Sequence, residues 1–236
     1  MGENRFGGCV AQRGQLSTFR ARRWGRGFPK SAQAAYGHLL QRWGIHLDRE
    51  SGQSLEPQAF FDEGLAGYAV EIGCGGGEHV VAQALLFPER GFIACEIHTR
   101  GVLRLLRSIE ACRLHNVRVY AGDGLGLVSR FVPASIDGLF TLFPDPWPKR
   151  RHYGRRLFQP DTVGVLAGAL RAGACWRFAT DCSSYAAWAH ACLRDSSMRL
   201  VSEGMGVPPR VDWPVTRYQC KAQRAGREVV FSIWQR

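Results

Sequence analysis

The chain has 236 residues, of which 45% are hydrophobic, so it can fill the core of one α/β domain of ordinary size. Thirty-one Lys and Arg residues against 20 Asp and Glu give a formal net charge of +11, which favours nucleic acid or another anionic surface as a partner. No uncharged apolar run approaches the roughly 18 residues of a membrane span, and residues 1–30 lack the apolar core of a signal peptide. We therefore expect no membrane partner and a cytoplasmic protein.

The cysteines and histidines predict no metal site. The eight cysteines include no C-x-x-C pair and no spacing with a matching histidine pair. We expect most of the cysteines to be buried as small hydrophobic side chains. The seven histidines are scattered along the chain, and each is expected to be structural or exposed rather than a ligand.

The first part of the chain is strongly basic. Residues 1–30 contain seven Lys and Arg against one acid, with many glycines and little apolar periodicity, which is typical of a flexible basic arm. A satellite helix is predicted from Ser31, as N-cap, to Trp43, with Gly44 ending it. Residues 1–55 are therefore expected to form an arm and a satellite helix, and residues 56–236 the main domain.

From residue 68 onward, strands and helices alternate. The predicted strands are Tyr68–Ile72, Gly91–Ile97, Val117–Ala121, Ile136–Phe143 and Ala174–Thr180. The predicted helices are Glu78–Phe87, Thr99–His115, Gly124–Phe131, Pro160–Leu170 and Ser183–Arg194, with Thr99 and Ser183 as possible N-caps. This alternation predicts a doubly wound, mostly parallel sheet with right-handed crossovers. Residues 198–201 and 228–234 can add two strands at one edge.

A glycine-rich turn at residues 73–77 follows the first strand. Gly73 and Gly75 let the backbone adopt positive φ and pass close to a ligand. A dinucleotide fingerprint starting at Gly73 needs glycine at position 78, where Glu78 stands, and the chain has no P-loop motif. NAD and P-loop nucleotides are therefore disfavoured.

Acidic residues stand at the ends of four successive strands: Glu71, Glu96, Asp123 and Asp145. In a parallel sheet these ends meet at one edge, so the four acids are expected to ring one pocket. Glu96 can accept both hydroxyls of a ribose, and Asp123 can face an adenine. The set matches a cationic cofactor that contains ribose and adenine, as S-adenosylmethionine does. Each acid taken alone can equally be a helix N-cap or a surface charge.

Asp145 lies within a run of prolines at the end of the fourth strand. Pro144, Pro146 and Pro148 fix their own φ and push each preceding residue toward extended conformations, so Phe143, Asp145 and Trp147 are disfavoured in helical geometry. Asp145 is therefore expected to be held stiffly.

A basic cluster follows directly. Five cations lie within eight residues: Lys149, Arg150, Arg151, Arg155 and Arg156. Together with the aromatic rings of His152 and Tyr153 they suit a negatively charged polymer. The competing interpretation is a solvated loop whose prolines only end a strand.

Six motifs connect these features: VEIGCGGG, ACEIH, AGDG, LFPDPWPKRRHYGRR, FATD and PVTRYQ. In this order and at these separations they resemble the bacterial tRNA (guanine-N7)-methyltransferases, over about residues 19–236. The FPDPW-x-K segment is the most specific of them. The resemblance implies a Rossmann-like class I S-adenosylmethionine-dependent methyltransferase fold, with tRNA as partner and methyl transfer to a guanine N7 in the variable loop. It leaves the oligomeric state open.

The resemblance also implies roles for particular residues. Glu71, Glu96, Asp123 and Asp145 would contact S-adenosylmethionine, and Asp145 would also be catalytic. The substrate guanosine would be held by Lys149, Asp181, Thr216, Arg217, Tyr218 and Gln219. The RNA would be bound by Arg151, His152, Tyr153, Gly154, Arg155 and Arg156.

The chain departs from the family near its end. The family usually has Glu where Gln219 stands, so a carboxylate is replaced by an amide. The sequel after Gln219 matches the family only loosely, and residues 1–18 have no clear counterpart in it.

The implied reaction agrees with the residues. Guanine N7 has an in-plane lone pair and no proton, so positioning should contribute most of the catalysis. Asp145 could stabilise the developing positive charge, Asp181 could accept from guanine N1–H and the exocyclic amine, and Trp147 could stack on a base.

Two other interpretations remain. One is a methyltransferase that acts on an exocyclic amine of a base, since a proline-flanked Asp145 beside Trp147 faintly resembles the motif of such enzymes. The other is a catalytically silent RNA-binding protein. The FPDPW-x-K segment argues against the first, and the full set of cofactor acids argues against the second.

Overall fold

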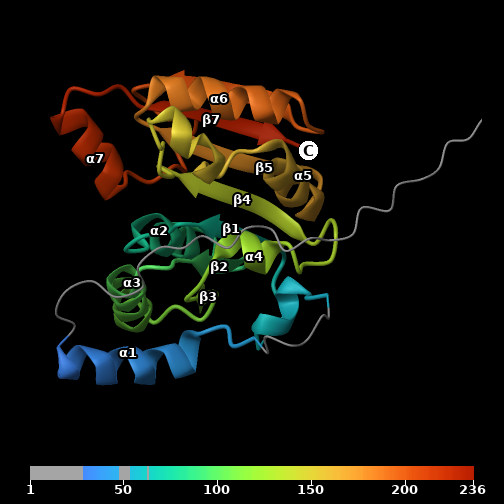
Figure 1. Ribbon diagram of the computed structural model, residues 1–236. Helices are drawn as coiled ribbons and strands as arrows, with labels where there is room; N and C mark the ends of the chain where they lie inside the picture. Colours follow the sequence, from blue (N-terminus) through green and yellow to red (C-terminus); the bar gives the residue numbers. More distant parts are fainter. Residues whose placement is uncertain (1–28, 48–53, 63) are drawn as a thin grey trace, which may run out of the picture.

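The computed structural model describes residues 29–47, 54–62 and 64–236 (Figure 1). The basic arm predicted for residues 1–30 lies almost wholly outside the described residues. The helices are α1 (Lys30–Trp43), α2 (Glu78–Leu86), α3 (Thr99–Ala111), α4 (Gly124–Val128), α5 (Pro160–Ala169), α6 (Ser183–Arg194), α7 (Arg217–Arg224) and two 3-10 helices, η1 (Pro57–Phe60) and η2 (Arg150–Arg155). The strands are β1 (Tyr68–Ile72), β2 (Gly91–Cys95), β3 (Val117–Tyr120), β4 (Ile136–Leu142), β5 (Leu170–Thr180), β6 (Arg199–Met205) and β7 (Val230–Gln235).

The seven strands form one sheet in the order β3-β2-β1-β4-β5-β7-β6. Strands β1 to β5 pair in parallel, and β7 lies antiparallel between β5 and β6. This confirms the predicted doubly wound, mostly parallel sheet with an antiparallel edge. The chain builds outward from β1 to β3 and then places β4 on the other side of β1. Because ligands of such sheets bind beyond the carboxyl ends of the strands where the order reverses, the ends of β1 and β4 locate the site.

Helices cover both faces of the sheet (Figure 1). On one face α1, α2, α3 and α7 enclose a core that includes Leu105, Leu106 and Phe231. On the other face α4, α5 and α6 enclose a core that includes Phe158 and Trp176. The site at the carboxyl ends of the strands is therefore flanked by one helical layer on each side.

Helix α3 is strongly amphipathic. Val102, Leu105, Leu106 and Ile109 are buried at helical spacing and pack under the sheet. Helix α1 packs on α3, where Glu110 accepts hydrogen bonds from Arg42 at 2.9 Å and from the indole of Trp43 at 3.0 Å. These contacts attach α1 to the domain and leave the polar face of α3 outward.

Three predicted N-caps are wrong by one or two positions. The N-cap residues are Pro29, His98 and Cys182, where Ser31, Thr99 and Ser183 were expected. None of the three N-cap residues makes a side-chain hydrogen bond to its helix, so these helices begin without the hydroxyl cap that was predicted. Strand β5 also begins earlier than predicted, at Leu170, because it pairs with the start of β4 before an irregularity in the register.

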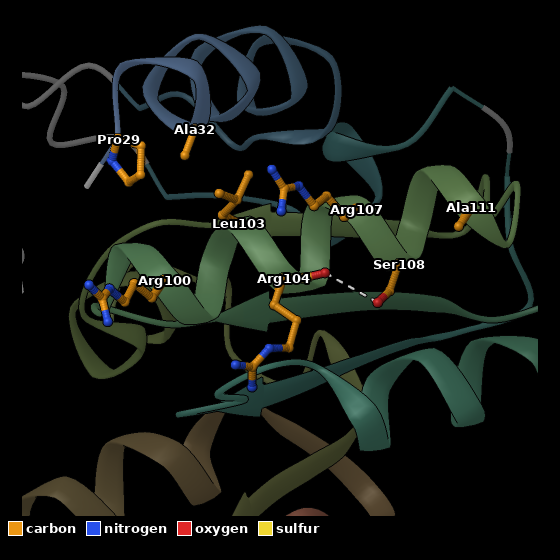
Figure 2. A pocket seen from close by; sticks show the side chains of 8 residues that line it. All are labelled: Pro29, Ala32, Arg100, Leu103, Arg104, Arg107, Ser108 and Ala111. Carbon is orange, nitrogen blue, oxygen red and sulfur yellow. Dashed lines mark hydrogen bonds between the residues drawn. The ribbon is translucent and has the colours of Figure 1, made fainter. Parts of the chain in front are cut away.

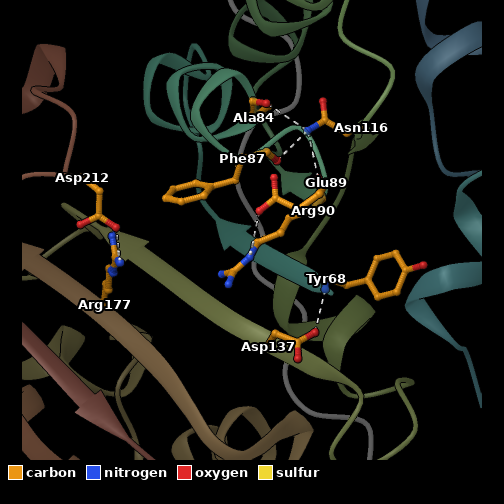
Figure 3. Close-up of polar contacts among 9 residues, drawn as sticks. All are labelled: Tyr68, Ala84, Phe87, Glu89, Arg90, Asn116, Asp137, Arg177 and Asp212. Atoms are coloured by element: carbon orange, nitrogen blue, oxygen red, sulfur yellow. Dashed lines mark hydrogen bonds and ion pairs between the residues drawn. The ribbon is translucent and has the colours of Figure 1, made fainter. Parts of the chain in front are cut away.

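Polar contacts fix the amino ends of the strands, on the side of the sheet away from the carboxyl ends (Figure 3). The backbone N–H of Tyr68 donates to Asp137 Oδ2 at 2.8 Å. The side-chain nitrogen of Asn116 lies 3.1, 3.3 and 3.0 Å from three backbone carbonyl oxygens between residues 84 and 90. These contacts join the starts of β1 and β4 to each other and the start of β3 to the loop that follows α2. The amino ends of the strands are therefore held by structural contacts.

The described cysteines are unpaired, and only Cys74 and Cys95 among them are buried. The expectation that most are buried is therefore wrong, because the other five described cysteines are partly or fully exposed. Burial raises the pKa of both Cys74 and Cys95, which keeps these thiols protonated. Within the described ranges, no helix has the length and apolar character needed to cross a membrane.

Candidate active site

A pocket lies at the carboxyl ends of β1, β2, β3 and β4, at the switch point of the sheet. Of the residues predicted from the sequence, six line it: Gly73, Gly75, Glu96, Asp123, Asp145 and Tyr218. The parallel sheet brings these residues together from positions more than 140 apart in the chain. The described residues contain no group of three or more His, Cys, Asp or Glu that could hold a metal ion.

Glu96 follows β2 and organises the glycine-rich turn. Its Oε2 accepts the backbone N–H of Gly75 at 2.8 Å, and its Oε1 accepts the backbone N–H of His98 at 2.7 Å. Gly73 and Gly75 have φ of 77° and 58°, which favour glycine. Each carboxylate oxygen has a second lone pair, so Glu96 can hold this turn and still accept hydroxyl groups from a ligand in the pocket.

Asp123 follows β3 and caps α4. Its side chain accepts the backbone N–H of Leu125 at 3.1 Å, and the same carboxylate lines the pocket. The two roles considered for it from the sequence, helix cap and ligand contact, are therefore compatible. The cap fixes the direction of the carboxylate before any ligand binds.

Glu71 lies behind the pocket wall and is not among the residues that line it. It is 4% exposed, and its Oε2 lies 2.7 Å from Nδ1 of His79, which is also buried. The edge of the His79 ring packs on Phe140, with centroids 4.6 Å apart. In this structure Glu71 ties β1 to α2, and its direct contact with a cofactor stays a prediction.

The backbone on both sides of Asp145 is strained. Phe143 and Trp147 have φ of 53° and 42°, in the left-handed region, so the expectation that they are extended is wrong. Such conformations cost of order 1–3 kcal/mol each and persist only where surrounding contacts impose them. The N–H of Phe143 donates to the carbonyl of Ala179 at 2.8 Å, and its ring stacks on Tyr218 with centroids 6.0 Å apart.

Arg156 does not lie on the RNA-facing surface predicted for it. It is 3% exposed, and its Nε donates to the carbonyl oxygen of Pro146 at 2.9 Å. Its guanidinium lies 3.6 Å from the ring centroid of Tyr153 and 5.0 Å from that of Trp188. This corrects the sequence prediction, because a buried guanidinium already bound to the backbone cannot meet a phosphate. Arg156 instead holds the loop that carries Asp145.

The rest of the basic cluster is on the surface. Lys149, Arg151, Gly154 and Arg155 are exposed on and before η2, where cations can face a polyanion. His152 is half-buried, and its pKa is lowered by desolvation and then by the neighbouring cations. His152 is therefore mainly neutral at pH 7 in the free protein and adds no charge to the cluster.

Trp147 is enclosed by this cluster. Its ring packs edge to face with His152 at 5.6 Å and lies 5.1 Å below the guanidinium of Arg155. These contacts pin the second strained residue of the Asp145 loop. Base stacking by Trp147 stays a prediction, and it would require Arg155 to move.

The residues predicted to hold the substrate guanosine fall into two groups. Tyr218 is 43% exposed and faces the pocket from the start of α7. Thr216 caps the same helix by accepting the N–H of Gln219 at 3.2 Å, and both residues are buried. Gln219 thus supports the helix end that presents Tyr218, and its Oε1 has no partner among the described residues.

The remaining substrate residues lie outside the pocket. Arg217 is exposed, with Nε 3.9 Å from Glu78 Oε1. Asp181 follows β5, and its Oδ2 accepts a hydrogen bond from Arg227 Nε at 2.8 Å. A guanine that bound Asp181 would have to replace Arg227. Lys149 is exposed one residue before η2.

The sequence did not single out His98 and Leu157 as pocket residues. His98 was open to prediction, because it follows Glu96 by two positions beyond the end of β2. Leu157 reaches the pocket because η2 turns the chain back toward the sheet. No local signal in the sequence predicts that return.

The sheet order, the glycine-rich turn and the three carboxylates around the pocket define a Rossmann-like methyltransferase. A family model described as "Putative methyltransferase" matches residues 66–232. Among curated proteins, tRNA (guanine-N(7)-)-methyltransferase of Nitrobacter hamburgensis is 38% identical over 94% of this chain and 88% of its own length. The enzyme of the same name from Bradyrhizobium diazoefficiens is 34% identical over 92% and 93%. The chain belongs to the tRNA (guanine-N(7)-)-methyltransferase family.

Solved structures show the same fold at low sequence identity. TrmN from Thermus thermophilus aligns with a TM-score of 0.54 and 14% identity, covering 87% of this chain and 48% of that one. The 16S rRNA methyltransferase KamB aligns with a TM-score of 0.51 and 14% identity, covering 73% of this chain and 88% of that one. These likenesses confirm the class I methyltransferase fold predicted from the sequence.

Proposed function

We propose that this protein transfers the methyl group of S-adenosylmethionine to N7 of a guanine in the variable loop of tRNA. The observation that carries the proposal is the position of Asp145, held by a strained loop at the wall of an acid-lined pocket at the switch point. The similar proteins named as tRNA (guanine-N(7)-)-methyltransferases support the same reaction. We place the enzyme in the cytoplasm, where tRNA is available.

The pocket suits the cofactor in its charge and in its glycine-rich backbone. Glu96, Asp123 and Asp145 line it, so a cationic ligand is favoured over an anionic one. The positive φ of Gly73 and Gly75 lets the backbone approach that ligand without side chains. Glu96 would hold the ribose hydroxyls, and Asp123 would lie on the adenine side. When bound, S-adenosylmethionine supplies an electrophilic methyl group.

Catalysis by the protein consists of positioning and charge stabilisation. Guanine N7 carries a lone pair and no proton, so no base has to act first. Asp145 would stabilise the positive charge that develops on the purine. Tyr218, stacked on Phe143 at the pocket wall, offers an aromatic face on which the guanine can lie.

One experiment tests the function directly. Unmodified bulk tRNA is incubated with labelled S-adenosylmethionine, digested to nucleosides and separated. We expect the label in 7-methylguanosine. Label in a methylated adenosine or cytidine would replace the proposal with methylation of an exocyclic amine, and no transfer to any tRNA would indicate an RNA-binding protein without activity.

The substitution Arg156→Lys is expected to loosen the Asp145 loop. An ammonium cannot reproduce both the bond to the Pro146 carbonyl and the stacking over aromatic rings. We expect the free energy of unfolding to fall by about 1.5–3 kcal/mol, and kcat to fall while the affinity for S-adenosylmethionine changes little. Denaturant titration and single-turnover kinetics measure the two effects.

The matched control for Arg156→Lys is Arg150→Lys, since Arg150 is exposed in the same cluster. The control should leave both quantities unchanged. If Arg156→Lys instead weakened only RNA binding, the buried contact would not organise the loop.

The substitutions Arg151→Gln and Arg155→Gln together should weaken tRNA binding in a salt-dependent way. Each phosphate contact that is lost should lower the magnitude of the slope of log K against log salt by about 0.7–0.9. We expect a smaller slope, measured by RNA titration at several salt concentrations. Calorimetry with S-adenosylmethionine checks that the pocket stays intact when Arg155 no longer covers Trp147. An unaltered slope would mean that η2 presents only a solvated face.

A further inference from the structure

A second basic surface lies on the far side of the pocket from η2, on helix α3. It forms a groove of about 650 Å³ between α3 and the start of α1, with Pro29 and Ala32 on its α1 side. Figure 2 shows Arg100, Arg104 and Arg107 projecting from α3, with Arg107 on the side of α1 and Arg104 turned away from α1 toward the start of α2. Their spacing of four and three residues places them on neighbouring parts of one helix face. We call these three residues the α3 arginine face.

The residues that line this groove include three cations and no carboxylate. All three arginines are exposed. The acid nearest along α3, Glu110, is turned to α1 and bound to Arg42 at 2.9 Å. No ion pair within 4.0 Å is formed by Arg107 with any described residue. The groove therefore presents a positive surface to solvent.

The positive surface continues to the pocket. Nη1 of Arg104 lies 4.0 Å from Glu78 Oε1, and Nε of Arg217 lies 3.9 Å from the same oxygen. Arg217 directly precedes Tyr218, which lines the pocket. Arg104 and Arg217, which share the carboxylate of Glu78, thus connect the α3 arginine face to the aromatic ring proposed to receive the guanine.

The two basic surfaces lie on opposite layers of the fold. η2 packs on the layer of α4 to α6, where Tyr153 contacts Trp188 of α6 with ring centroids 5.5 Å apart. Helix α3 belongs to the other layer, with α1 and α2 (Figure 1). A polyanion whose target base enters the pocket between the layers can therefore be held from both sides.

We propose that the α3 arginine face is a second phosphate-binding surface for the tRNA substrate, and the proposal rests on the proposed function. From Arg100 to Arg107 the helix advances about 10 Å, since each residue rises about 1.5 Å. One strand of a duplex carries about three phosphates over that length. Guanidinium groups bind phosphate oxygens with two parallel hydrogen bonds, which suits an RNA backbone.

The test compares two double variants of the full chain. Arg104→Gln with Arg107→Gln removes two charges from the α3 arginine face. Arg194→Gln with Arg199→Gln removes two exposed charges from the end of α6 and the start of β6, on the side of the sheet away from the pocket. Unmodified tRNA is titrated against each protein over a range of salt concentrations, and methyl transfer is measured at varied tRNA concentration.

We expect the α3 double variant to lower the magnitude of the salt slope by about 1.4–1.8 and to weaken binding about tenfold or more at 0.1 M salt. The KM for tRNA should rise while kcat at saturating tRNA stays near that of the unmodified protein, because no reacting atom is touched. The control should match the unmodified protein in salt slope, affinity, KM and kcat.

A second variant separates RNA binding from an effect on the cofactor. A side-chain atom at Gly76 would lie 2.8 Å from Arg104 Cδ, so Arg104 packs on the glycine-rich turn. Arg107→Gln alone does not touch that turn and should lower the slope by about half as much. An unchanged slope in both α3 variants, in an enzyme that still forms 7-methylguanosine, would overturn the second surface. Failure to methylate tRNA would instead overturn the proposed function and leave the binding result separate.

Discussion

Asp145→Asn is expected to lower methyl transfer by about 10²-fold or more, roughly 2.7 kcal/mol, while the fold and most cofactor binding remain. The change removes a charge and almost no volume, and Pro144, Pro146 and the Arg156 contact would still hold the loop. Because the developing charge exists only in the transition state, the loss should appear in kcat. Single-turnover rates at saturating S-adenosylmethionine and tRNA measure it.

Asp181→Asn provides the comparison for Asp145→Asn. Asp181 lies outside the pocket, paired with Arg227, and is predicted to bind the guanine rather than to act on the reacting atoms. Asp181→Asn should therefore raise the KM for tRNA more than it lowers kcat. A normal single-turnover rate for Asp145→Asn under saturating conditions would end its catalytic assignment. Asp145 would then only shape the pocket wall.

Glu96→Ala is expected to weaken the binding of S-adenosylmethionine by at least about thirtyfold, or roughly 2 kcal/mol, with calorimetry as the measurement. Two losses combine. The ribose would lose its acceptor, and the N–H groups of Gly75 and His98 would lose the oxygens that fix the glycine-rich turn. Affinity should fall without RNA present, because the pocket belongs to the rigid sheet.

Glu96→Gln distinguishes these two contributions. An amide has one acceptor oxygen, so its NH2 group would face one of the two backbone N–H donors. We therefore expect Glu96→Gln to be nearly as harmful as Glu96→Ala. Asp123→Asn is the matched control, since a rotated amide can still accept from Leu125 and should cost less. Unchanged affinity in Glu96→Ala would remove Glu96 from the site.

The sheet and most of the pocket could be predicted from the sequence because both depend on local periodicity and strand order. Alternating strands and helices predicted the parallel sheet, and acids placed just after strands, such as Glu96 and Asp123, came together at one edge. Glu71 differs because it lies within β1 rather than after it. Its side chain alternates to the α2 face, where it meets His79.

Tertiary contacts account for what could not be predicted at the Asp145 loop. The rule that residues before proline are extended failed at Phe143 and Trp147, where contacts from Ala179, Tyr218 and Arg155 impose another conformation. The number of charges in the cluster also could not predict that Arg155 is exposed and Arg156 buried. These neighbours point to opposite sides at the end of η2, one to solvent and one into an aromatic cage.

The position of β7 bears on how the protein folds during synthesis. It is the last strand of the sheet along the chain, yet it lies between β5 and β6 and contributes Phe231 to one core and Trp234 to the other. A nascent chain that ends before β7 leaves β5 with an open edge and both cores incomplete. The sheet can therefore close only after residues 230–235 have emerged from the ribosome, and until then the exposed edge and apolar surface favour aggregation.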